Sequence, residues 1–157
     1  METTRHVTAT IYIVNDGATA LHWHDRLGIR VPPGGHVDRD ELPHTGGLRE
    51  VREETGLEPT LVHGTEEIDA PAGRVLPRPA HVMLYDINVH SNGHVGHQHI
   101  DHIYYAHVES REIDPAPNEA GPEVWNWFRK EELRASDIES DTVTIGIEAI
   151  ETVERLA

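Results

Sequence analysis

The chain has 157 residues, a length that favours one domain able to bury a hydrophobic core. It has 28 acidic side chains against 13 lysines and arginines, so its net charge is −15, and it has no cysteine. This composition excludes disulfides, thiolate catalysis and cysteine-based zinc sites, and it argues against binding to a nucleic-acid backbone, which needs a basic surface.

The kind of charge also bears on where the protein works. Lys130 is the single lysine, and the other 12 cations are arginines. An acid-rich, lysine-poor surface suits very high salt, where screening removes self-repulsion, so we infer a salt-adapted protein of the haloarchaeal kind. An acidic mesophilic protein is the alternative. Because the chain lacks an apolar run of roughly 18 residues and a signal-peptide core, we expect a soluble cytoplasmic protein without membrane contact.

The N-terminal region predicts a pair of strands. Thr8–Val14 alternates β-branched and aromatic residues, and a turn leads to a partner strand over Ala18–Trp23. Because His22 and His24 alternate with apolar neighbours, we place them on the solvent side of that strand. Pro32–Gly35 then predicts a sharp loop whose glycines allow backbone to approach a ligand closely.

A helix is predicted next, with Pro43 in its first turn and Gly56 at its end. Gly46 and Gly47 would lie inside this helix, where each glycine costs roughly 1 kcal/mol relative to alanine. Either another segment packs closely against them or the helix begins later, and Leu42 is a poor N-cap.

The remainder of the chain predicts further strands and a second helix. Strands mixed with two helices indicate an α/β or α+β domain. The predicted strands lie near Leu61–His63, over His81–Val89 and Ile100–Val108 around the turn Ser91–His97, and over Val124–Phe128; the last helix begins at Ser140 or Asp141, with an apolar stripe of Val143, Ile147, Ile150 and Val153.

Three carboxylates share one stripe of the first helix. Glu50, Glu53 and Glu54 stand at i, i+3 and i+4, followed one turn later by Leu57. Like charges at i,i+4 weaken an isolated helix by roughly 0.2–0.5 kcal/mol per pair, so a cation in front of them is expected. Oxygen ligands favour a hard divalent ion, Mg²⁺ or Mn²⁺.

The order of residues around these acids is specific. Gly35, Glu41, Arg49-Glu50-Val51, Glu53-Glu54 and Gly56-Leu57 occupy every fixed position of the Nudix box. The chain therefore resembles the MutT-like Nudix hydrolases. The resemblance implies a single domain over 1–157 with the Nudix fold, a mixed sheet between helices. It also implies metal-dependent attack of water on the diphosphate bond of a nucleoside diphosphate linked to another moiety.

The resemblance assigns roles to the box residues. The Gly35 carbonyl and the box glutamates would supply metal oxygens, while Arg49 would orient the acids through Glu53 or Glu41. The implied catalytic residues are Glu41, Arg49, Glu50, Glu53, Glu54 and Glu119, and the implied metal ligands are Gly35, Glu50, Glu53 and Glu54.

The general base stays open among three positions. Glu119 precedes Trp125 by six residues and resembles the loop acid of triphosphate-cleaving members. Glu123 is the competitor, because other members carry an acid just before the same aromatic. A box glutamate is the third possibility.

Histidines crowd the region between two predicted strands. His94, His97, His99 and His102 fall close together, which suits a second metal site, a set of phosphate ligands or a polar hairpin tip. Because His97 and His99 share a strand face that His102 does not, we favour the polar tip. His97, His99 and Asp101 are retained as candidate substrate-binding residues.

The sequence leaves the substrate undecided among a nucleoside triphosphate, ADP-ribose and a dinucleoside polyphosphate. The rival from another class is a non-catalytic nucleotide-binding or regulatory module, against which the complete set of carboxylates argues. A homodimer is expected by analogy alone.

Overall fold

One mixed sheet organises the chain, in a computed structural model that describes residues 1–64 and 66–156. The strands β3, β2, β1, β7 and β5 lie in that order, with β4 beside β1, β6 beside β7 and β8 beside β2. The β1–β7 pair is parallel and the others are antiparallel. The elements are β1 (Thr4–Asn15), β2 (Ala18–His24), β3 (Ile29–Val31), β4 (Gly34–His36), α1 (Pro43–Thr55), β5 (Thr60–Leu61), β6 (His81–Val89), β7 (Val95–His107), β8 (Trp125–Arg129), α2 (Lys130–Arg134) and α3 (Ser140–Leu156), with a short 3₁₀ turn over Pro122–Val124.

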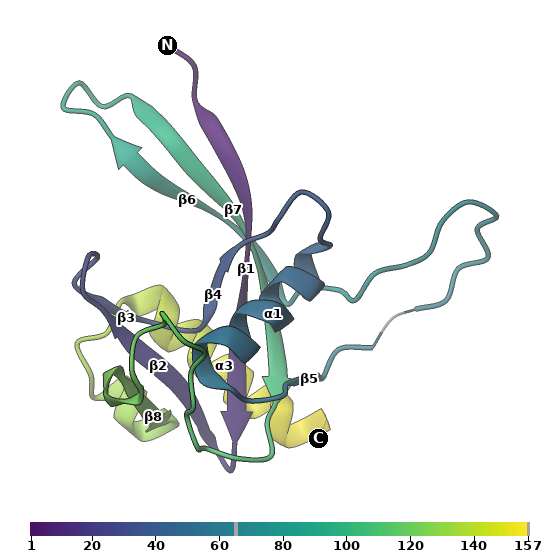
Figure 1. Cartoon of the computed structure of the whole chain (residues 1–157), viewed down its shortest axis with the longest axis vertical. Coiled ribbons are helices and arrows are strands. Elements are labelled where there is room, and N and C mark those ends of the chain that lie inside the picture. Colours follow the sequence, from purple (N-terminus) through teal and green to yellow (C-terminus); the bar gives the residue numbers. More distant parts are fainter. Residues whose placement is uncertain (65, 157) are drawn as a thin grey trace.

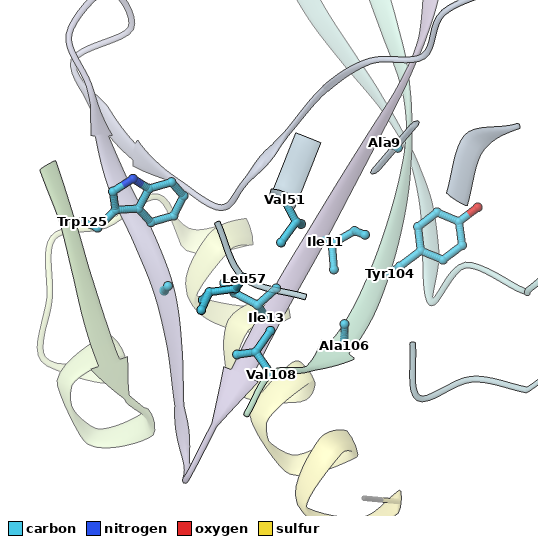
Figure 2. Packing of buried hydrophobic residues seen from close by; sticks show 10 residues of the cluster. Ala9, Ile11, Ile13, Val51, Leu57, Tyr104, Ala106, Val108 and Trp125 are labelled. Atoms are coloured by element: carbon cyan, nitrogen blue, oxygen red, sulfur yellow. The ribbon is translucent and has the colours of Figure 1, made fainter. Parts of the chain in front are cut away.

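Helices cover both faces of the central strands. On one face, Val51 of α1 packs against Ile11 and Ile13 of β1 (Figure 2). On the other face, Ile150 of α3 belongs to a second cluster with Tyr12. Figure 1 shows α1 and α3 on either side of β1. The predicted α+β class and the arrangement of a mixed sheet between helices are therefore confirmed.

The alternation along β1 explains its central place. Odd positions such as Ile11 point toward α1 and even positions such as Tyr12 point toward α3. Because both faces are covered, the strand has an almost continuous apolar run over Ile11–Val14. Figure 1 also shows that the first part of β1 and the β6–β7 hairpin extend beyond the helices.

The long strands exceed their predicted bounds in this extension. β1 begins at Thr4 instead of Thr8, and β7 begins at Val95 instead of Ile100. The turn predicted over Ser91–His97 is therefore too long. The backbone hydrogen bonds of the observed turn lie within His90–His94. These added residues are mostly polar and partly exposed, so they lack the apolar alternation that marks a strand.

Other elements differ from the prediction because contacts with distant segments determine where they begin and end. The predicted loop Pro32–Gly35 includes the start of β4, whose Gly34 and Gly35 pair with β1. The helix α2 was not predicted; Glu132 stabilises its start by accepting a hydrogen bond from the Arg129 N–H at 3.0 Å. The buried face of α3 centres on Ile145, Ala149, Ile150 and Val153, with Val143 and Ile147 half-buried at its margins.

Three other predicted strands are present, two of them with different bounds. The strand near Leu61–His63 is the two-residue β5, and the last strand begins at Trp125 instead of Val124. The strand over His81–Val89 matches β6. Within the described ranges, no helix is long and apolar enough to span a membrane.

Candidate active site

Helix α1 carries the predicted acids and begins at Pro43, as expected. Thr45 compensates for the apolar N-cap, because its hydroxyl accepts from the Leu42 N–H at 3.0 Å and donates to the Leu42 carbonyl at 2.9 Å. Gly46 and Gly47 lie inside the helix and are buried. A Cβ at Gly47 would lie 3.1 Å from Ile11, so close packing of the helix on β1 is the reason for the glycine.

Glu50 and Glu54 form the centre of the site. Their carboxylates are close enough to interact with each other, and their side chains are 18% and 13% exposed. Burial, followed by the neighbouring Glu50 carboxylate, raises the pKa of Glu54 far above its usual range, and burial also raises the pKa of Glu50. Two largely buried acids so close together favour a proton or a cation between them.

Backbone surrounds this pair on the side of β4. The Gly34 N–H lies 3.4 Å from Glu54 Oε1, and a Cβ at Gly35 would lie 2.7 Å from Glu50 Oε1. The glycine therefore leaves the space that the Glu50 carboxylate fills. The carboxylate oxygens of Glu50 and Glu54 are hard oxygen donors, which fits Mg²⁺ or Mn²⁺.

Arg49 connects the acids, and both of its predicted partners are present. Its Nε and Nη2 donate to the two oxygens of Glu41 at 2.7 and 2.9 Å. Its Nη1 donates to Glu50 and to Glu53, each at 3.1 Å. The Arg49 guanidinium lowers the pKa of Glu41, whose hydrogen bonds in turn raise the pKa of Arg49. Glu53 is the most exposed of the box acids, at 42%.

A loop from the distant part of the chain meets the end of α1. The Asp114 N–H donates to the Thr55 carbonyl at 2.9 Å and the Ala116 N–H donates to the Glu53 carbonyl at 2.8 Å, so the loop satisfies two carbonyls of the last helical turn. Gly56 ends the helix with φ +72°, and the Asp114 carbonyl lies where its Cβ would be. Glycine is thus required twice over for this contact.

This loop brings Glu119 to the box. Asn118 adopts φ +75°, a conformation that asparagine tolerates, immediately before Glu119. Glu119 and Glu54 line the same cleft, of about 230 Å³, and the Glu119 charge contributes to raising the pKa of Glu54. The competitor Glu123 is exposed and folds back over Gly121, outside the residues that line the cleft.

His22 is a site residue that the sequence analysis missed. It lines the cleft beside Glu54, with Nε2 3.8 Å from Glu54 Oε2 and its ring 4.5 Å from that of Trp125. Burial lowers the pKa of His22 to about 4, so at neutral pH this contact is not an ion pair. The placement of His22 on the solvent side is wrong, and Trp23 is the exposed residue, because the α1 face of β2 is covered. Alternation alone does not tell which face is covered.

The other predicted substrate residues lie elsewhere. His97 and His99 lie on the face of the sheet away from α1 and are not brought to the carboxylates. Asp101 is buried on that face, where it accepts hydrogen bonds from Thr8 at 3.0 Å and Thr10 at 2.8 Å, and burial raises its pKa. These contacts give Asp101 a structural role between β1 and β7.

A second hollow adjoins the start of α1. It has a volume of about 420 Å³ and is bounded by the loop after β5. Its lining includes Pro43 of α1 and His102 and Tyr104 of β7. Since even positions of β7 face α1, both hollows open on the same side of the sheet as the carboxylates.

Comparison with known proteins agrees with this geometry. The model of the NUDIX domain family matches residues 4–145. A NUDIX-family hydrolase structure from Clostridium perfringens has 30% identity and a TM-score of 0.81, over 96% of this chain and 99% of that one. Among curated proteins there is no match.

More distant structures share the fold. A MutT protein from Bacillus halodurans has 16% identity and a TM-score of 0.63, over 92% of this chain and 82% of that one. A UDP-X diphosphatase has 17% identity and a TM-score of 0.58, over 99% and 64% of the two chains. With the family model spanning most of the chain and the box carboxylates assembled on α1, this protein belongs to the Nudix family and is a hydrolase.

Proposed function

We propose that the protein hydrolyses the diphosphate bond of a nucleoside diphosphate linked to another moiety, with Mg²⁺ or Mn²⁺ as cofactor. The observation that carries this proposal is the contact between Glu50 and Glu54, two largely buried acids whose pKa values are raised. Such a pair is unfavourable unless it shares a proton or binds a cation.

The Gly35 carbonyl and the carboxylates of Glu50, Glu53 and Glu54 would hold the ion. When bound, it would neutralise the diphosphate and lower the pKa of a water molecule. Arg49 fixes the directions of Glu50 and Glu53 through its hydrogen bonds at 3.1 Å. Glu41 in turn holds Arg49, so both act as positioning residues.

Glu119 is proposed as the general base, because it lines the cleft beside Glu54 while Glu123 does not. It would accept a proton from the water whose oxygen attacks phosphorus. As the new P–O bond forms, the bond from phosphorus to the bridging oxygen breaks, and the leaving phosphate takes up a proton from the protonated acid or from solvent. His22 is neutral and would donate or accept a hydrogen bond at the edge of this cleft.

The test is product release from a panel of diphosphates, comprising nucleoside triphosphates, ADP-ribose and dinucleoside polyphosphates, with each metal. Glu54→Gln should abolish turnover. Glu119→Gln should lower kcat about 10²–10⁴-fold, the usual contribution of a general base, with little change in metal affinity. Glu123→Gln is the matched control and should keep its activity. No turnover across the panel by folded wild-type protein would contradict the proposal.

We also propose that the protein works in the cytoplasm at high salt, as its net charge of −15 suggests. Thermal unfolding in low and in multimolar KCl tests this: a salt-adapted protein should gain stability steeply with salt, whereas an acidic mesophilic protein should show a modest gain. The predicted homodimer and the lack of affinity for nucleic-acid backbones stay predictions, which sedimentation equilibrium and filter binding at low salt would check.

A further inference from the structure

Three neighbouring strands place histidines on one face of the sheet. His6 of β1 lies directly beside His99 of β7, and the pairing of Thr8 with His36 brings β4 to the same place. The odd positions Ala9 and Ile11 contact α1, so these even positions of β1, with their partners, face away from α1. His97 lies on the same face, two residues before His99.

The imidazoles converge. His36 Nε2 and His99 Nε2 are 3.3 Å apart, and His6, His36 and His99 each have a ring nitrogen within 4.8 Å of the other two. The ring of His6 is 5.0 Å from that of His36. These residues come from positions 6, 36 and 99, so the cluster is not the polar tip of a single hairpin.

The spacing is that of ligands on one small ion. Zinc binds imidazole nitrogen at roughly 2.0–2.1 Å, so two ligands of a tetrahedral ion lie about 3.3 Å apart. The observed separation between His36 and His99 is 3.3 Å. His6 stands near the exposed start of β1, where rotation of its side chain can shorten its distance to the other two.

We propose that His6, His36 and His99 form a binding site for a borderline transition-metal cation such as Zn²⁺, Ni²⁺ or Co²⁺, separate from the carboxylate site of α1. Neutral imidazole suits these ions, whereas Mg²⁺ and Mn²⁺ prefer oxygen. The two sites lie on opposite faces of β4, because Gly35 adjoins Glu50 and the next residue, His36, joins the histidines.

His97 lies beside these three histidines and could add to the site. Its ring lies 4.5 Å from that of His6 and 5.1 Å from that of His99. Its Nδ1 is 2.8 Å from Thr4 Oγ1, whose own proton is directed to the Gly96 carbonyl at 3.2 Å. In that arrangement Nδ1–H is the donor and Nε2 keeps its lone pair, as in a histidine ligand held by an outer hydrogen bond.

The test is calorimetric titration of untagged, chelator-treated full-length protein with Zn²⁺. The Glu50→Gln/Glu54→Gln background removes the carboxylate site and should still bind about one Zn²⁺. Adding His6→Ala and His99→Ala should weaken that binding by a factor of at least about 100, since one ligand of the three remains. The matched control His90→Ala/His94→Ala removes the stacked pair at the hairpin tip and should bind as before.

A second measurement keeps all the histidines in place. Co²⁺ added to the Glu50→Gln/Glu54→Gln protein should broaden or shift the imidazole NMR signals of His6, His36 and His99 while leaving those of His90 unchanged. Zinc binding that disappears with the two carboxylates, that falls equally in both histidine double variants, or Co²⁺ effects spread evenly over all histidines, would overturn the proposal. Because these readouts measure binding, they do not depend on the proposed hydrolysis.

Discussion

Replacing Gly35 by alanine should damage the active site while leaving the fold intact. The new Cβ would lie 2.7 Å from Glu50 Oε1, whereas an unstrained contact is about 3.5 Å, so the carboxylate must move by about 0.8 Å. The backbone at Gly35 belongs to a strand with ordinary φ, which alanine adopts readily. The nearest atoms belong to a flexible side chain, so Glu50 yields before the sheet does.

The expected loss of activity follows from that displacement. A hard ion such as Mg²⁺ demands near-octahedral ligands at about 2.0–2.1 Å, and a shift of 0.8 Å removes Glu50 from such a position. Misplacement of about 1 Å can cost roughly 100-fold in rate, which corresponds to about 2.7 kcal/mol. The stability change should be small, because alanine also restricts the unfolded chain by about 0.4–1 kcal/mol.

The assay is kcat/KM over a range of Mg²⁺ concentrations, beside thermal unfolding with chelator. Gly73→Ala is the matched control, since its Cβ would meet only Ala70 Cβ at 3.8 Å. Gly35→Ala should raise the Mg²⁺ concentration for half-maximal activity and lower the maximal rate. Wild-type activity and metal dependence in this variant would refute the assignment of the Glu50 carboxylate to the metal.

Further predictions concern the helix and its acids. Gly47→Ala places a Cβ 3.1 Å from Ile11. The overpacking, typically about 1–3 kcal/mol, should exceed the gain in helix propensity of about 1 kcal/mol, so the unfolding temperature should fall while KM stays unchanged. A higher unfolding temperature than that of the wild type would contradict this prediction. Because Glu54 has a raised pKa, its contribution to the stability of metal-free protein is complete below the ordinary pKa of 4.5 and is lost as pH rises toward about 9. In chelator, Glu54→Gln should therefore unfold at a higher temperature than wild type at pH 8 but not at pH 4, and excess Mg²⁺ should reverse the order; equal unfolding temperatures at pH 8 would count against it. Arg49→Ala should leave the acids unpaired, which should lower the free energy of unfolding by roughly 1–3 kcal/mol and also lower kcat. Arg49→Lys should restore stability only in part, because lysine lacks the planar fork that donates to both oxygens of one carboxylate.

The sequence by itself determined the local part of the site. The i, i+3, i+4 spacing places Glu50, Glu53 and Glu54 on one stripe of a helix whatever surrounds it, and Gly56 ends that helix. It also determined the apolar segments of β1 and β6, because alternation and β-branched residues are properties of the chain alone.

Tertiary structure decided which distant residues join the glutamates of α1 and which histidines come together. Glu119 reaches Glu54 because loop amides bind the free carbonyls at the end of α1, and His6 meets His36 and His99 because of the register of three strands. His22 became a cleft residue because its face of β2 is the one turned toward α1, where Glu54 lies 3.8 Å away. Helical spacing is fixed by the geometry of neighbouring residues, whereas strand register and the choice of covered face depend on the packing of the whole chain.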